Sequence, residues 1–92
     1  MRISVRYLAQ LRQAEGTAGE EVELQTASSA RELVTQLAQR RGGDLGRLLL
    51  DSDGRLHPTI LLFVGDEQVG PEEYTPLKEG DIITLLSPIA GG

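Results

Sequence analysis

The chain finishes on two glycines, Gly91 and Gly92, after the apolar run Leu85–Ala90. Glycine is costly to order and has no side chain to pack, so two of them at a terminus contribute little to a fold. They do supply a thin backbone that ends in a carboxylate. A carboxylate is a poor electrophile, but as an acyl-adenylate it accepts sulfur or an amine. By residue type alone, Gly92 is either a reactive group or a loose end, since chain ends favour small residues.

The residue types that other covalent chemistry needs are scarce in this chain. It has no cysteine, one histidine (His57), and no phosphate loop of the G-x-x-x-x-G-K type. Asp51 and Asp53 have the spacing that starts a calcium loop, but Leu62 stands where the closing acid belongs, so we expect no metal. The chain is therefore expected to be a carrier or substrate protein, not an enzyme, and to bind no cofactor itself.

The composition limits the kinds of partner. The net charge is −5, with the acids spread along the chain, and this opposes nucleic-acid binding, which needs a basic face. No apolar run approaches the roughly 20 residues of a membrane span, and the first residues do not build a signal-peptide block. The lack of cysteine gives no reason for export. We expect a single cytoplasmic domain that binds neither membrane nor nucleic acid.

The first part of the chain predicts a strand pair. Arg2–Tyr7 alternates between polar and apolar residues, as a half-buried strand does. Leu8–Glu15 predicts a short turn of helix that Gly16 closes. Alternation returns in Glu21–Gln25, which predicts a second strand, antiparallel to the first.

The clearest helix follows these strands. Ser29 with Glu32 three residues later forms a capping box, and Gly42–Gly43 predicts the helix end. Arg40 and Arg41 fall in the last turn, where they complement the helix dipole or, alternatively, form a phosphate patch. One apolar stripe faces the core: Ala30, Leu33, Val34, Leu37 and Ala38.

The second half of the chain predicts more strands. Asp44–Leu50 predicts a short helical or irregular piece, and Thr59–Val64 predicts a strand covered on both faces. Gly65–Asp66 suits a two-residue hairpin turn into a short edge strand, Glu67–Val69. Asp81–Leu86 predicts the last strand.

This order of elements predicts an α+β fold in which one main helix covers a mixed sheet of four to five strands. If the last strand pairs parallel to the first, both lie in the middle of the sheet, which is the β-grasp, or ubiquitin-like, arrangement. We expect residues 1–86 to form this domain and residues 87–92 to project from a central strand as an extended tail.

The whole chain resembles the ubiquitin-like sulfur carriers of the MoaD/ThiS family. The likeness is carried by Tyr7–Arg12 with Gly16 and Thr17, by the capped helix Ser29–Gln39, by Leu77–Ile83, and by the ending Ser87–Gly92. The amino-terminal stretch looks most like the small subunit of molybdopterin synthase.

The resemblance implies a reaction and its partners. An E1-like adenylyltransferase uses ATP to activate the terminal glycine, and a sulfur donor of persulfide or rhodanese type converts the adenylate to a thiocarboxylate. An acceptor synthase, such as a molybdopterin synthase large subunit, then uses the sulfur. By position, Gly92 is the acyl carrier, Gly91 keeps the approach thin, and the partner grips Pro88, Ile89 and Ala90 in extended form.

Several alternatives remain open. The sulfur can go to molybdopterin, thiamine, cysteine or a tRNA base, or Gly92 can instead be joined to lysines of target proteins. A non-covalent β-grasp interaction module is a third possibility. A docking surface beside the tail should expose apolar side chains, and Phe63 and Leu61–Leu62 are the candidates. The same residues can equally fill the core, because strand alternation turns only one set inward.

Overall fold

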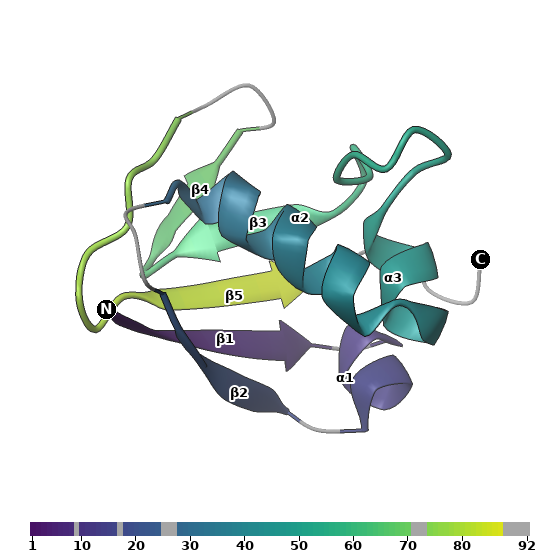
Figure 1. Ribbon diagram of the computed structural model, residues 1–92, viewed down its shortest axis with the longest axis horizontal. Coiled ribbons are helices and arrows are strands. Elements are labelled where there is room, and N and C mark those ends of the chain that lie inside the picture. Colours follow the sequence, from purple (N-terminus) through teal and green to yellow (C-terminus); the bar gives the residue numbers. More distant parts are fainter. Residues whose placement is uncertain (9, 17, 25–27, 71–73, 88–92) are drawn as a thin grey trace.

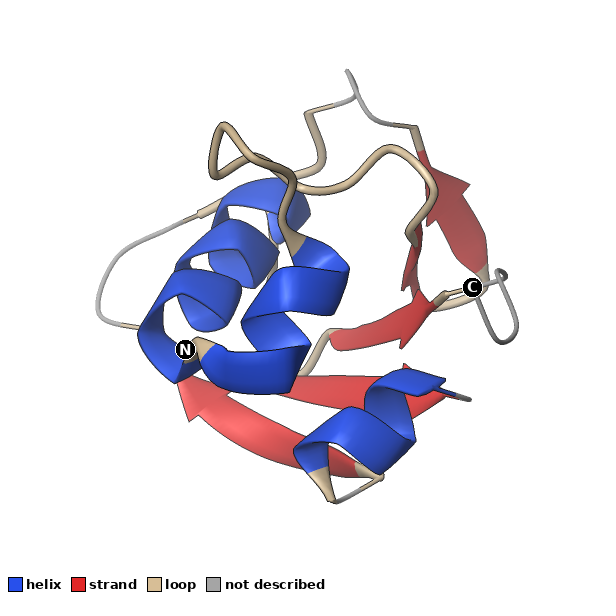
Figure 2. Ribbon diagram, turned by 90° about the vertical axis from the view of Figure 1, so that its right-hand side faces the viewer, coloured by secondary structure: helices blue, strands red, loops and turns tan. Residues whose placement is uncertain are grey.

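The computed structural model describes residues 1–8, 10–16, 18–24, 28–70 and 74–87. Five strands of this part form one sheet in the order β2-β1-β5-β3-β4. In Figure 1, α2 crosses one face of the sheet, and in Figure 2 the strands curve around it. This is the predicted β-grasp fold. The elements are β1 (Arg2–Leu8), α1 (Gln10–Glu15), β2 (Gly19–Glu23), α2 (Ala30–Arg41), α3 (Gly43–Leu49), β3 (Leu61–Val64), β4 (Glu67–Val69) and β5 (Ile82–Leu86).

The first and last strands lie at the centre of the sheet. β1 and β5 run parallel, with Val5 opposite Ile83 and Tyr7 opposite Leu85. These four side chains are completely buried, because every second residue of each strand points toward the helices. The prediction of a parallel, central last strand is therefore confirmed.

Helix α2 begins and ends as its sequence predicts. Ser29 Oγ accepts from Glu32 N at 3.1 Å, and Ser29 N donates to Glu32 Oε1 at 3.0 Å. Gly42 ends the helix with φ +60°, a conformation that residues with a Cβ rarely adopt. The whole predicted apolar stripe is buried in the core: Ala30, Leu33, Val34, Leu37 and Ala38.

Two short helices lie at the end of the sheet toward which β1 and β5 run (Figure 1). The piece predicted as helical or irregular after Gly42 is helix α3, and it buries Leu45 and Leu49. Gly46 of α3 approaches α2 so closely that a Cβ there would lie 3.1 Å from the Ala38 carbonyl oxygen. The described helices do not include one long and apolar enough to cross a membrane.

Two strands begin two residues away from their predicted starts. β3 begins at Leu61 and not at Thr59, because His57 organises a turn in front of it: His57 Nδ1 accepts from Thr59 N at 3.2 Å, and the His57 carbonyl accepts from Ile60 N at 3.0 Å. β2 begins earlier than predicted, since Gly19 already pairs with Arg6. Gln25, its predicted end, lies outside the described residues.

A tight turn sets the start of β5. Gly80 has φ +86°, and Asp81 N donates to the Lys78 carbonyl at 3.1 Å while Asp81 Oδ2 accepts from Lys78 N at 2.8 Å. The Asp81 carbonyl in turn accepts from Ser4 N at 3.0 Å. The turn therefore fixes the register of β5 against β1, and a glycine is needed where φ is positive.

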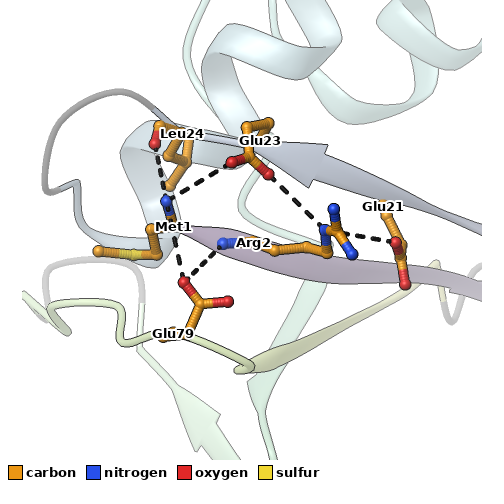
Figure 3. A network of polar contacts seen from close by, with 6 residues as sticks. All are labelled: Met1, Arg2, Glu21, Glu23, Leu24 and Glu79. Atoms are coloured by element: carbon orange, nitrogen blue, oxygen red, sulfur yellow. Dashed lines mark hydrogen bonds and ion pairs between the residues drawn. The ribbon is translucent and has the colours of Figure 1, made fainter.

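Charged groups surround the start of β1 (Figure 3). Glu79 Oε1 accepts from Arg2 N at 3.2 Å and lies 3.8 Å from the Met1 amine. Arg2 Nε lies 3.7 Å from a carboxylate oxygen of Glu21 and 3.7 Å from one of Glu23. These carboxylates are largely exposed, so each ion pair contributes no more than about 1 kcal/mol.

Candidate functional site

The site predicted at the tail is approached through the end of β5. Leu86, the last residue of β5, pairs with Leu8 of β1 on one side and with Leu61 of β3 on the other. Ser87 follows and is buried, at 8% exposure, so the packed body reaches one residue beyond β5. A central strand held on both sides therefore leads directly to the predicted tail.

The tail itself lies outside the described residues. The roles assigned to Pro88, Ile89, Ala90, Gly91 and Gly92 therefore stay predictions.

The sheet face opposite the helices carries an apolar patch at this end of β5. We call this face the open face. The side chains of Leu8, Leu86 and Leu61 form a row across three adjacent strands, since register partners point the same way. Leu8 is 43% exposed. Ile82, which lies four residues before Leu86 in β5 and so points to the same face, is 42% exposed. The apolar patch consists of Leu8, Leu61, Phe63, Ile82 and Leu86.

Strand alternation divides the predicted docking residues Leu61, Leu62 and Phe63 between the core and the open face. Leu62 is only 2% exposed and pairs with Leu85 in the core, so this candidate fills the core. Leu61 and Phe63 are half-buried and belong to the other set, on the open face. The expectation that one set points inward and the other outward is confirmed. A docking role for Phe63 stays a prediction.

The neighbouring row of the open face consists of Arg6, Thr84 and Phe63, and it is polar toward β1. Arg6 is exposed and is aligned with Thr84 of β5, which pairs with Phe63. On the other side of Arg6 stands Gly19, and both line a shallow hollow of about 400 Å³ together with Ser4, Glu20, Glu21 and Ile82. The apolar patch thus borders a guanidinium and a shallow hollow.

Gly19 is required by a close backbone approach. A Cβ at this position would lie 2.7 Å from the Val5 carbonyl oxygen, which is a clash with backbone and not with a movable side chain. The glycine at position 19 therefore lets β2 join the sheet beside β1.

The other groups that could do chemistry hold turns in place. Asp51 Oδ1 accepts from Asp53 N at 2.9 Å and from Arg55 N at 3.0 Å, and the hydrogen bond from Arg55 N is the main cause that lowers the pKa of the Asp51 carboxyl. His57 Nδ1 lies 2.7 Å from Thr59 Oγ1. Within the described ranges, no group of three or more His, Cys, Asp or Glu residues could hold a metal ion.

Two arginines raised the possibility of a phosphate patch at the end of α2. Arg41 contacts the Glu20 carboxylate, which also accepts from the buried Tyr7 hydroxyl at 2.7 Å, whereas Arg40 is exposed. Arg41 is thus engaged with Glu20, and the reading as helix-dipole complement and surface charge is the one that this geometry favours.

Leu8, Ile82 and Leu86 were not predicted as site residues from the sequence. In the alternation of Arg2–Tyr7, Leu8 falls on the polar, solvent-facing side of the strand. An apolar residue at such a position was the one feature of the sequence that could have marked it as a site residue. Placing Ile82 and Leu86 on the same face requires the register of β5, which the sequence alone does not fix.

A β-grasp body whose central strand leads to two final glycines defines a class of ubiquitin-like carrier proteins. The chain belongs to the ThiS family, whose family model matches residues 5–92. This class comprises ubiquitin-like sulfur carriers and modifiers.

Solved structures share the fold. SAMP1 from Haloferax volcanii superposes with a TM-score of 0.82 at 21% identity, over 100% of both chains. The complex of subunits 1 and 2 of the molybdopterin-converting factor from Helicobacter pylori matches with a TM-score of 0.61 at 22% identity, over 100% of both chains. The BexX/CysO complex of Amycolatopsis orientalis matches with a TM-score of 0.63 at 28% identity, over 98% of this chain and 99% of that one.

Comparison with curated proteins gives no significant match. Two of the three structures named above were solved as complexes with another protein.

Proposed function

We propose that this chain is a cytoplasmic sulfur carrier whose Gly92 carboxylate is activated as an adenylate and then converted to a thiocarboxylate. A carboxylate oxygen attacks the α-phosphorus of ATP on an E1-like adenylyltransferase, and pyrophosphate leaves. A persulfide sulfur of the donor protein then attacks the carbonyl carbon and displaces AMP, and a thiol reduces the acyl disulfide to release the thiocarboxylate. ATP is bound by the partner, and this chain contributes the carbonyl group.

The observation that carries the proposal is the exit of β5. This strand is paired on both sides, so the body holds the base of the tail firmly while Gly91 and Gly92 add no bulk beyond it. When the rigid body docks on a partner, it brings the thin tail to the active site of that partner. Less entropy is then lost when the tail is ordered there.

The apolar patch supplies the docking surface in this proposal. Leu8, Leu61 and Leu86 lie beside the base of the tail, and Phe63 and Ile82 extend the patch along the open face. A partner that covers these side chains removes apolar surface from water close to the reacting group. Arg6 at the border of the patch favours a partner that presents a carboxylate next to its apolar contacts.

The acceptor that we propose is a synthase of the molybdopterin type, with this chain as the small subunit. Support comes from the resemblance of the amino-terminal stretch and from the shared fold with subunit 1 or 2 of a molybdopterin-converting factor. A cysteine-forming acceptor is the second candidate, and the BexX/CysO complex, at 28% identity, is a case in which a protein of this fold binds a protein other than a molybdopterin-converting subunit. Attachment of Gly92 to lysines of target proteins uses the same activation and is the third.

A paired purification separates these candidates. The chain carrying an amino-terminal tag, and the same chain lacking Gly92, are expressed in the source cells, and the proteins that copurify are identified by mass spectrometry. We expect an adenylyltransferase and a molybdopterin-synthase-like large subunit with the full chain, and loss of function without Gly92.

Other results assign other functions. A thiazole or cysteine synthase in place of the large subunit overturns the molybdopterin assignment. Target lysines that carry a Gly-Gly remnant favour a protein modifier. Full function without Gly92 contradicts the carrier proposal and supports a non-covalent module.

A further inference from the structure

A second concave surface lies on the helix side of the sheet, away from the apolar patch. A groove of about 540 Å³, which we call the α2 groove, is lined by the N-cap Ser29, by α2 residues between Arg31 and Gln36, by the loop residues 54–56 and by Tyr74. Figure 1 shows the three elements that form it: α2, the loop that joins α3 to β3, and the segment that leads into β5. The α2 groove stays accessible when a partner covers the open face.

The described residues that line the α2 groove include two arginines and one glutamate. Arg31 and Arg55 line it, and neither guanidinium lies within 4.0 Å of a carboxylate of the described residues, whereas Arg2, Arg41 and Arg47 each have an acidic partner. Glu32 is the one carboxylate among the lining residues, and it is engaged in the helix cap with Ser29 N. Among the described lining residues, two cations therefore stand against one engaged anion, and the nearby Asp51 carboxylate interacts electrostatically with Arg55.

An apolar recess lies beside these cations. Leu56 is buried in the floor of the α2 groove, and with Arg31 it also lines an adjoining narrow cavity of about 60 Å³. Ile60, Leu61, Leu62 and Val69 also line that cavity, together with the polar residues His57 and Gln68. Tyr74, at the rim of the α2 groove, is 72% exposed. The surface therefore combines an aliphatic recess, an exposed aromatic ring and two guanidinium groups.

The loop side of the α2 groove is held in its present shape. Asp51 Oδ1 accepts from Arg55 N, and Leu50 pairs with Leu56 in an isolated bridge. A surface that is already ordered loses little conformational entropy when it binds. From Ser29 to Gln36, α2 spans about 10 Å at 1.5 Å per residue, which is the length of about three residues of extended peptide.

We propose that the α2 groove binds a short acidic peptide segment of a partner protein, with an aliphatic side chain in the recess and carboxylates on Arg31 and Arg55. Guanidinium groups pair with carboxylates in a bidentate geometry, and this favours an acidic peptide over a neutral one. The overall negative charge disfavours a nucleic acid, whose many phosphates the acidic remainder of the chain repels. This inference is independent of the chemistry proposed for Gly92.

A titration followed by NMR tests the proposal. The ¹⁵N-labelled full chain is titrated at low salt with the blocked peptide Glu-Leu-Asp-Glu, and separately with its uncharged analogue Gln-Leu-Asn-Gln. We expect saturable shifts of the amides of residues 31–36, 54–56 and 74 with the acidic peptide, at a dissociation constant of about 1 mM or tighter. Added salt should weaken the binding, and the analogue should bind at least about fivefold more weakly.

Substitutions assign the effect to the two guanidinium groups. Arg31→Glu and Arg55→Glu should each lower the affinity for the acidic peptide at least about fivefold. Arg31→Gln and Arg55→Gln should have intermediate effects. Arg12→Glu, an exposed residue of α1 outside the α2 groove, is the matched control and should leave the affinity unchanged. The amide spectrum of each variant shows whether it is folded.

Four results overturn the proposal. They are the absence of saturable shifts, equal binding of the uncharged analogue, shifts confined to the open face, and tighter binding of a short oligothymidylate than of the acidic peptide. Deletion of Gly92 should not change the titration, so a failure of the carrier proposal is separable from a failure of this one.

Discussion

Leu61 of β3 and Leu86 of β5 are register partners whose side chains lie on the open face, at the end of the strand that leads into the tail. The same strand pair places Leu62 opposite Leu85 in the core. Neighbouring residues of β3 thus contribute to two different properties: Leu62 to the stability of the body, and Leu61 to the apolar patch. Substitutions at these two positions separate docking from folding.

Leu61→Asp should weaken partner binding and leave the fold nearly unchanged. The side chain is half-buried at the edge of the apolar patch, so a charge there disrupts an apolar interface while its carboxylate keeps access to water. We expect at least a tenfold loss of affinity for the adenylyltransferase, measured by calorimetry, and a change in unfolding free energy of about 1 kcal/mol or less. Unchanged affinity would show that the apolar patch is not the docking surface.

Leu62→Ala should have the reverse effect. Leu62 is 2% exposed, and removing its side chain leaves a cavity between the sheet and the helices. We expect a loss of about 2–5 kcal/mol in the free energy of unfolding by urea, with affinity for the adenylyltransferase retained under conditions where the variant is folded. A loss below about 1 kcal/mol would contradict the placement of Leu62 in the core.

Gly19→Ala should destabilise the edge of the sheet. A methyl group at this position lies 2.7 Å from the Val5 carbonyl oxygen, so β2 has to shift away from β1. We expect a loss of about 1–3 kcal/mol in thermal or urea unfolding. Glu21→Ala, an exposed residue of the same strand, is the control and should change the stability by no more than about 0.5 kcal/mol.

Acidification should weaken the cap of α2. The backbone hydrogen bond from Ser29 lowers the pKa of the Glu32 carboxyl below its ordinary 4.5, so the ionised form stabilises the folded state. That contribution is complete above pH 4.5 and is lost as the pH falls through the lower pKa of the folded protein. The difference in unfolding free energy between wild type and Glu32→Gln should therefore shrink between about pH 6 and pH 3. A difference that stays constant would contradict this role of Glu32.

Local signals in the sequence predicted most of the body. The capping box of Ser29 and Glu32 and the positive-φ glycine at Gly42 act within a few residues, so both ends of α2 were predictable. The start of β3 was not, because the side chain of His57 forms a turn with Thr59 in place of the expected strand pairing. The residue types of Thr59 and Ile60 do not distinguish a strand from a turn.

The candidate site was only partly predictable, because it depends on how strands are aligned. Phe63 was identified from its strand, but the row formed by Leu8, Leu86 and Leu61 follows from the pairing of three segments far apart in the chain. Likewise, Arg31 and Arg55 both line the α2 groove only because the loop before β3 folds back beside α2. Spacing in the sequence gives no sign of either arrangement.

The central claim is that the carboxylate of Gly92 carries the sulfur, and the intact mass of the protein tests it most directly. Protein isolated from cells with an active adenylyltransferase and sulfur donor should contain a species heavier by the exchange of one oxygen atom for one sulfur atom. Fragmentation should assign this change to Gly92, and the species should be missing from cells without the adenylyltransferase. An unmodified mass in cells where the protein is functional, together with full function of the chain lacking Gly92, would contradict the account.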